Sequence, residues 1–387
     1  MSDRPHETGM HADRHEPALD PSVAFRLTAD DLLGDLLWPK LLRVPGLTLR
    51  PGRIGLGVVA VLIVSLVDHL LAMASGGEAL QSTIADGASM LLETGEWPTE
   101  GAAVGRWRLW VVGLLTLVVV SFVSLAVGRM AAEEFARGRF PSWTEGLAWA
   151  VRYAGAAVLA HAIPLLVAGL LIGVLAVGGL ALLSVPGVNI LGAVLGVVGV
   201  GLGAAVVLLL VIYTAGCGML APAIAVEGVD GIDAMQRIFA YLIGQPLRWL
   251  LWTVLLLVQA AIVLGLLSIF AQLTAGATSW GAGLLIGGNA DLVAQGLPED
   301  GLTAPGAIAA RIMATVLQLP LLLVAGYGVA YFASGWTVQY LLLRRANDGQ
   351  DVTDIYVPGE VERRVDEVML RRSASQAEPA AGEDPTP

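Results

Sequence analysis

The longest stretch without charge constrains this chain more than any other feature. No Lys, Arg, Asp or Glu occurs from Tyr153 to Val226, and the same holds from Trp249 to Ala290 and from Ile312 to Leu343. A helix needs about 20 mostly apolar residues to cross the roughly 30 Å hydrocarbon core of a bilayer. These runs must contain several spans, so we expect an all-α integral membrane protein.

The distribution of charge agrees with this class. Only 14% of the residues are charged, whereas soluble domains carry about 25%. The formal net charge of −11 comes largely from the two ends of the chain and from two loops. Residues 1–27 are polar and acidic, and we expect a disordered cytoplasmic tail there. A second, mostly disordered cytoplasmic tail is expected over 344–387.

Six spans are predicted, at 54–74, 107–128, 152–179, 189–215, 248–273 and 308–342. Arg or Lys occurs before the first span, between the second and third, between the fourth and fifth, and after the sixth, but residues 74–105 and 274–310 contain neither. Positive residues stay in the cytoplasm, so both termini are predicted to be cytoplasmic. Residues 276–296 are interpreted as a re-entrant or interfacial piece, because a seventh span would place Arg344 and Arg345 outside.

A short amphipathic helix is predicted before every second span. Helix-start residues recur at equivalent places, as Asp230 with Asp233, Ser142 with Glu145, and Thr28 with Asp31. Gly244 and Pro246 should separate the third of these helices from the span that follows, and Pro39 should split the first. The six transmembrane helices are therefore predicted to form three hairpins, each preceded by a cytoplasmic interfacial amphipathic helix, over 28–128, 129–216 and 217–343.

Two of these connectors carry a resemblance to known families. "APAIAVEGVDGIDAMQRIFAYLIGQP" and "GRMAAEEFARGRFPSWTEGLAWAVRY" are similar to cytoplasmic connectors of bacterial six-span families, including the membrane domain attached to some glycerophosphodiester phosphodiesterases. The resemblance covers about 250 residues through weak motifs. It implies a membrane domain in the bacterial inner membrane without firm activity of its own. The catalytic hydrolase domain is absent from this sequence, so no catalytic residue is carried over.

The spans contain few polar residues, and these are the candidates for an intramembrane site. The candidate set is Asp68, His161, Gln259 and Gln318. His161 precedes Pro164, and Gln318 precedes Pro320; a proline frees a backbone carbonyl and bends a helix, as at the binding sites of transporters. One hypothesis is that the four residues converge on a polar cavity. The other, which we favour, is that each makes an isolated interhelical hydrogen bond worth about 0.6 kcal/mol.

Glycines at regular spacing in the fourth span predict close helix packing. Gly192, Gly196, Gly199 and Gly203 follow a small-xxx-small pattern, and Gly169 and Gly173 in the third span match it. We therefore expect these two spans to approach closely. A nucleotide-binding loop is the less favoured interpretation, because these glycines lie inside a span.

No metal site or disulfide framework is expected, because the chain has one cysteine, Cys217, and no paired Cys/His ligands. No catalytic residue and no cofactor is predicted, since HExxH, GxSxG and a Walker lysine are all missing. Nucleic acid is not an expected partner either. The predicted partners are the lipid bilayer and other membrane proteins or a second copy. We favour a non-enzymatic scaffold, assembly or envelope-homeostasis component, with a small-solute or lipid transporter using a polar site around His161 as the alternative.

Overall fold

The computed structural model describes residues 37–75, 103–283, 304–359 and 368–370. Regular secondary structure in this part of the chain is helical. The predicted tail over 1–27, and the residues Thr28 and Asp31, lie outside the described residues, as does most of 360–387. The elements are η1 (Trp38–Arg43), α2 (Val44–Thr48), α3 (Pro51–Ser75), α5 (Ala103–Arg137), α6 (Trp143–Leu183), α7 (Val188–Glu227), α8 (Gly231–Gly244), α9 (Pro246–Gly283) and α11 (Ala304–Asp348).

Within the described ranges, six helices are long and apolar enough to cross a membrane, namely α3, α5, α6, α7, α9 and α11. Each overlaps one predicted span, which indicates a multi-pass membrane protein. The helices α6 and α7 contain 41 and 40 residues. At 1.5 Å per residue each is about 60 Å long, roughly twice the thickness of the hydrocarbon core. These two helices therefore either tilt strongly or extend beyond the membrane.

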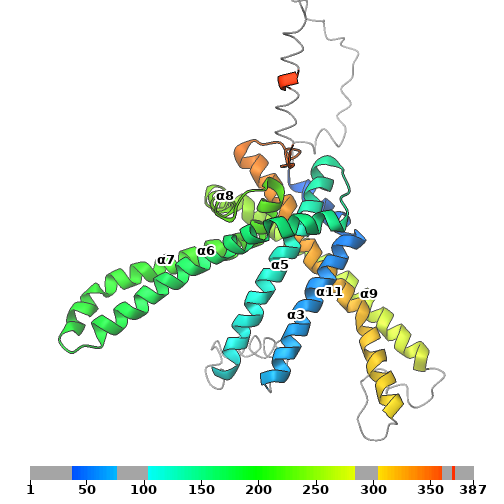
Figure 1. The fold of residues 1–387 in the computed structure, drawn as a ribbon, viewed down its shortest axis with the longest axis horizontal. Helices are drawn as coiled ribbons and strands as arrows, with labels where there is room; N and C mark the ends of the chain where they lie inside the picture. Colours follow the sequence, from blue (N-terminus) through cyan, green and yellow to red (C-terminus); the bar gives the residue numbers. More distant parts are fainter. Residues whose placement is uncertain (1–36, 76–102, 284–303, 360–367, 371–387) are drawn as a thin grey trace, which may run out of the picture.

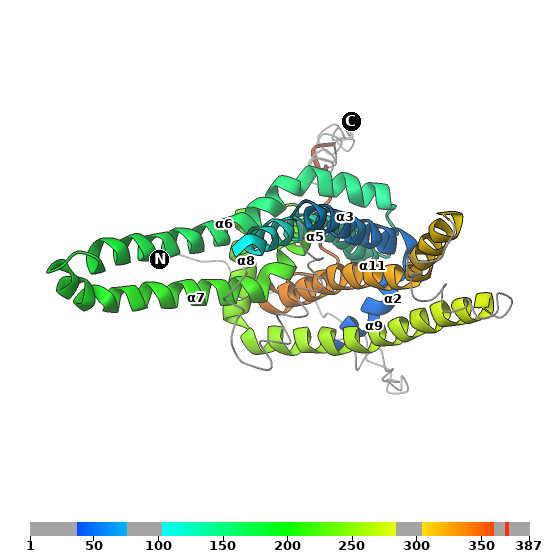
Figure 2. The same cartoon turned by 90° about the horizontal axis from the view of Figure 1, so that it is seen from below.

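The long helices meet at one end of the molecule and diverge toward the other (Figure 1). We call the meeting end the base; it contains η1, α2, α8, the first turns of α3 and α6 and the last turns of α5, α7 and α11. Figures 1 and 2 both show α6 and α7 side by side, projecting away from the remaining helices. The helices α9 and α11 are in contact with each other, and α11 also packs on α3 and α5.

The buried core lies at the base. Its fully buried side chains come from every element that meets there, and include Leu41, Leu125, Ile224, Ile238, Tyr331 and Leu342. The far halves of α6 and α7 expose large apolar side chains instead; Val197, for example, is 79% exposed. Apolar side chains exposed at this density are suited to contact with lipid. The backbone of a helix also tolerates lipid, because its polar groups are hydrogen-bonded within the helix.

The predicted helix starts are confirmed at α6 and α8. Ser142 and Glu145 form a capping box at the start of α6, and the side chain of Asp230 accepts hydrogen bonds from the first turn of α8. The turn between α6 and α7 contains Pro186 and Gly187, and Gly187 has a φ of +89°. Only glycine adopts this backbone conformation without strain.

The three connectors differ more from one another than the sequence pattern predicts. Only α8 is a separate helix of several turns, because Gly244 and Pro246 interrupt the chain before α9. The helix that begins at Ser142 continues unbroken into the third span as α6. Before α3, the described residues form the two short helices η1 and α2, and Pro39 and Pro45 each lie in the first turn of one of them. The split expected at Pro39 stays a prediction, because the residues before Leu37 lie outside the described part of the chain.

The segment 276–296 lies partly outside the described residues. Its first part continues α9, which ends only at Gly283. The hydroxyl groups of Thr274 and Thr278 donate to carbonyl oxygens one turn earlier, at 2.8 Å each. These bonds satisfy the hydroxyls within the helix. Because α9 ends at Gly283, it extends about three turns beyond the predicted end of the fifth span.

Replacing Asp230 with alanine is expected to destabilise the base by about 1 kcal/mol, the usual value of an N-cap. Its Oδ1 accepts from the backbone N–H groups of Ile232 and Asp233, both at 2.9 Å. Thermal unfolding of the purified protein in detergent would measure the change. Asp233→Ala is the matched control and should cost less, because Asp233 lies within the helix; an equal loss would contradict the capping role.

Candidate functional site

His161 makes a buried polar contact between two long helices. It lies on α6 with only 5% of its surface exposed. Its Nδ1 is 3.1 Å from the hydroxyl oxygen of Tyr213 on α7, and the two rings meet edge to face. This hydrogen bond joins α6 to α7 at the point where the pair leaves the base.

A mostly apolar cavity of about 280 Å³, with several polar side chains in its lining, opens beside His161, between α5, α6, α7 and α11. Besides apolar side chains and glycines, its lining includes Thr116, Ser121, Ser124, His161, Cys217 and Trp336. The hydroxyls of Thr116 and Ser121 donate to backbone carbonyls of their own helix, at 2.7 and 2.6 Å. Their oxygens still accept hydrogen bonds, so the cavity suits water or a small polar molecule.

The other three predicted site residues lie elsewhere. Gln259 on α9 accepts a hydrogen bond from the Tyr331 hydroxyl at 2.8 Å and donates to the Leu42 carbonyl oxygen at 3.3 Å. Gln318 is exposed on α11, and Asp68 is half-buried on α3. Of the four, only His161 lines the cavity beside it. The structure therefore does not bring the four residues together, and His161 and Gln259 each join neighbouring elements.

Buried charge is concentrated at the base instead. The carboxylate of Glu227, at the end of α7, is 8% exposed and forms an ion pair with Arg237 of α8. The same carboxylate accepts from the Tyr340 hydroxyl and lies 3.6 Å from Arg344, both on α11. One side chain thus connects three helices. In α8, burial and a hydrogen bond to Asp348 raise the pKa of Tyr241, so its hydroxyl stays protonated and donates.

A second buried cluster surrounds Arg129 of α5. Its Nε is 2.7 Å from Glu133, and its guanidinium lies 4.0 Å from the centre of the Trp149 ring on α6. The same side chain donates to the carbonyl oxygens of Ala225 and Tyr356, at 3.2 and 2.8 Å. Arg129 therefore ties α5, α6, α7 and the segment after α11 to one another.

Arg53 joins α3 to its neighbours in a similar way. It is 1% exposed and donates to the Glu134 carboxylate at 2.8 Å and to the Met130 carbonyl oxygen at 2.7 Å. A further hydrogen bond reaches the carbonyl oxygen of Leu47. Arg53 thereby holds α3 and α2 against α5.

Arginines also hold the segment after α11, residues 351–357, which we call the C-terminal strap. Arg344 donates to the carbonyl oxygens of Asp351 and Asp354, and Arg137 donates to that of Ile355 at 3.0 Å. The N–H of Tyr356 donates to Val226 at 3.0 Å. Since Ile355 is 2% exposed, the strap is part of the core of the base.

These base clusters were missed as sites from the sequence. Arg129 and Glu133 are four residues apart, so the sequence indicates an ion pair on one helix face. It does not indicate burial, because surface pairs have the same spacing. Every contact given above for these arginines joins two elements or two turns. Among the described residues, no group of three or more His, Cys, Asp or Glu is placed to hold a metal ion. The arrangement is suited to holding helices together.

Comparison of the chain with protein-family models, with curated proteins and with solved structures gave no match. The resemblance to the membrane domain of some glycerophosphodiester phosphodiesterases therefore stays a prediction. What the chain does has to be inferred from its own geometry.

The bond between His161 and Tyr213 is expected to contribute about 0.6 kcal/mol, the average for polar pairs between membrane helices. A double-mutant cycle of His161→Phe and Tyr213→Phe, followed by unfolding in mixed detergent micelles, would give the coupling energy. Thr214→Val is the control on the same helix, because the Thr214 hydroxyl donates only to Leu210 of its own turn. A coupling energy of zero would show that the contact contributes nothing to stability.

Proposed function

We propose that this chain is a non-enzymatic, multi-pass component of a bacterial inner membrane, acting in scaffolding, assembly or envelope homeostasis. The observation that carries the proposal is the contrast between the two ends of the molecule. The base uses buried arginines and glutamates to hold helices together. The outer halves of α6 and α7 present apolar surface on a projecting pair of helices. Such a pair is suited to packing against another membrane protein or a second copy.

The proposed architecture is three hairpins, α3 with α5, α6 with α7 and α9 with α11, each preceded by an amphipathic connector on the cytoplasmic side. The contacts within each pair support this arrangement. The polar base supports a cytoplasmic orientation, because Arg53, Arg129 and Arg344 all lie there and positive residues are retained inside. Both termini are then cytoplasmic.

A reporter fused after Pro387 tests the orientation without interrupting the C-terminal strap. The proposal expects activity from a reporter that works only in the cytoplasm, and none from one that works only outside. A fusion within residues 76–102 should give the opposite pattern. An external signal from the fusion after Pro387 would overturn the six-span topology.

Cross-linking in native membranes tests the assembly role. In a Cys217→Ser background, Val197→Cys places a thiol on the exposed face of α7, whereas Val206→Cys is 7% exposed and serves as the matched control. A thiol cross-linker with an apolar spacer should shift Val197→Cys to a discrete mass above that of the 40.2 kDa chain and leave Val206→Cys unshifted. Absence of a discrete product from Val197→Cys, and from further exposed positions along α6 and α7, would contradict the proposal.

The cavity beside His161 supports a second candidate, a transporter of small polar solutes. Its hydroxyl and imidazole groups lie within membrane-spanning helices, where polar groups mark solute pathways. Flux of a panel of small solutes into proteoliposomes would distinguish the candidates, with His161→Ala compared against His69→Ala, whose side chain is exposed on α3. The scaffold proposal expects no saturable flux. Saturable uptake that is lost only in His161→Ala would replace it by the transporter.

A further inference from the structure

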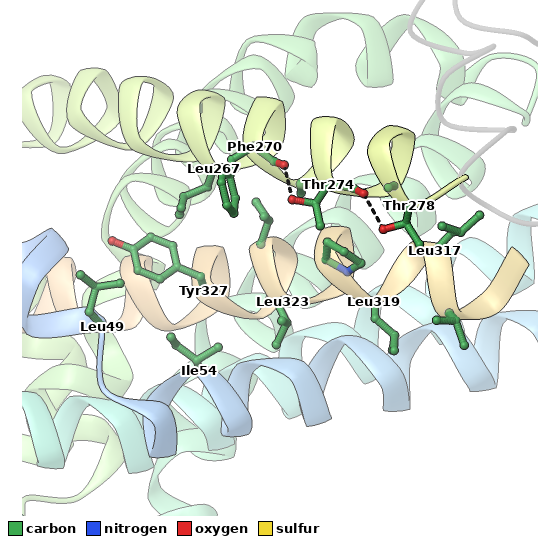
Figure 3. Close-up of a pocket in the computed structure, with 15 residues that line it drawn as sticks. Leu49, Ile54, Leu267, Phe270, Thr274, Thr278, Leu317, Leu319, Leu323 and Tyr327 are labelled. Carbon is green, nitrogen blue, oxygen red and sulfur yellow. Dashed lines mark hydrogen bonds between the residues drawn. The ribbon is translucent and has the colours of Figure 1, made fainter. Parts of the chain in front are cut away.

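A second and larger cavity has a different chemical character. It is a groove of about 570 Å³ that runs between α9 and α11, with the α2–α3 junction at one end (Figure 3). Leu49, Ile54 and Tyr327 line the end nearer the base, and Thr278 and Leu317 line the far end. The remaining lining residues are Leu267, Phe270, Ala271, Thr274, Ala275, Val316, Leu319, Pro320, Leu323 and Val324.

The lining of the groove is almost entirely apolar, and the hydroxyls among its described lining residues all donate within the protein. Thr274 and Thr278 donate to carbonyl oxygens of their own helix, as the dashed lines in Figure 3 show. The hydroxyl of Tyr327 donates to the Pro45 carbonyl oxygen at 3.2 Å. A polar solute would lose its own hydration there and gain little in return. The groove therefore favours an apolar occupant.

The volume of the groove and the direction of its opening further restrict the kind of molecule that it can bind. A volume of 570 Å³ lies in the range of small-molecule pockets, about 300–1,000 Å³. The groove opens sideways along the spans, since Phe270 and Leu323 in its wall are 71% and 56% exposed. Its elongated shape and its lateral opening match a single hydrocarbon chain entering from the bilayer.

Charge at the base end indicates which way that chain runs. Leu49 lines the groove, and the next residue, Arg50, has a guanidinium that stays 48% exposed beside its Glu134 partner. Basic side chains at this level attract the phosphate of a phospholipid. We propose that the groove between α9 and α11 binds one acyl chain of a phospholipid from the leaflet on the base side, with its headgroup near Arg50.

Photo-cross-linking tests the site and the direction of the chain. The full-length protein is reconstituted in vesicles containing phosphatidylglycerol with a diazirine either near the acyl carbonyl or near the terminal methyl group. Labelled peptides are then mapped by mass spectrometry. The first probe should label the residues around Leu49 and Leu267, and the second those around Thr278 and Leu317. Labelling in the reverse order would overturn the assignment to this leaflet.

Variants on one helix separate the groove from general contact with lipid. Ala275→Trp fills the groove and should lower labelling there about tenfold, whereas Ala277→Trp, on an exposed position of α9, should not. Thr274→Val should leave labelling unchanged, because its hydroxyl is used within α9. Labelling of α6 and α7 in the same sample reports whether each variant is folded.

Three outcomes would overturn the proposal. One is even labelling of all exposed apolar positions, which is what general contact with lipid produces. Another is groove labelling that Ala275→Trp leaves intact. The third is loss of phospholipid labelling when a small amount of free fatty acid is added, which would assign the groove to a fatty acid.

Discussion

Gly57→Val is expected to separate α3 from α11 and to destabilise the protein by about 3 kcal/mol, the upper part of the range for overpacking a close contact. A Cβ atom at Gly57 would lie 2.0 Å from the carbonyl oxygen of Gly326, and a Cβ at Gly326 would lie 2.6 Å from the backbone nitrogen of Val58. Both obstacles are backbone atoms, so no side-chain rotation relieves them. The two helices have to move apart.

Gly55→Val is the matched control for this prediction, because a Cβ at Gly55 meets no described atom within 4 Å. Both substitutions add the same side chain to the same helix within one turn of each other. Unfolding of the two variants in mixed micelles, compared with the unmodified chain, isolates the effect of the crossing. Equal losses of stability would mean that the crossing of Gly57 with Gly326 is not tight.

Arg129→Met is expected to cost about 3–5 kcal/mol, as is usual when one partner of a buried ion pair is removed. The methionine keeps much of the side-chain volume but removes four interactions together, one of them the hydrogen bond to the Ala225 carbonyl oxygen. Glu133, itself 6% exposed, loses its 2.7 Å partner, Trp149 loses the cation above its ring, and the C-terminal strap loses a donor to Tyr356.

Arg139→Met provides the comparison, because Arg139 also pairs with Glu133, at 2.8 Å, but is 60% exposed. Exposed pairs contribute about 0–1 kcal/mol, so this variant should unfold almost like the unmodified protein. Adding Glu133→Gln to Arg129→Met should recover part of the lost stability, because the buried Glu133 carboxylate would otherwise keep only the exposed Arg139 as an ionic partner. Equal effects of Arg129→Met and Arg139→Met would show that burial does not determine the strength of this network.

The elements of the fold were predictable because their signals are local. Six charge-poor runs gave six long helices, and Asp230 and Ser142 cap helices where the capping patterns place them. The continuity of α6 was not predictable by the same means. A capping box marks where a helix begins, and no Gly-Pro pair follows it to mark an end before Leu183. The separate helix predicted there rested on analogy with α8.

The packing of the helices was less predictable because it depends on rotation about each helix axis. The glycines of the fourth span were expected to give the closest approach to the third. Of these, Gly192 lies against the backbone of Leu182, but a Cβ at Gly196 or Gly203 meets no described atom within 4 Å. Another tight crossing is formed by Gly57 and Gly326, on helices far apart in sequence. A glycine pattern on one helix does not identify the partner helix.

The candidate site was also only partly predictable, because it too depends on how the helices pack. His161 was identified as a polar residue within a span, but the hydroxyls of Ser121 and Ser124 that share its cavity belong to α5. Their spacing of three residues in an apolar span was a readable signal of a polar face. Gln259 and Gln318 differ in burial although both lie in apolar spans. Composition alone identified the polar residues, and only the three-dimensional packing shows which of them meet.

The C-terminal strap has a consequence for the order in which the protein is made. Arg129 and Arg137 belong to the second long helix to be synthesised, but their carbonyl acceptors at Tyr356 and Ile355 lie more than two hundred residues later in the chain. Membrane helices insert before they pack on one another. Until the ribosome has released residues 351–357, these guanidinium groups lack their final acceptors. Closure of the base is therefore a late event of biosynthesis, and a chain truncated after Asp348 would insert its spans but remain open at the base.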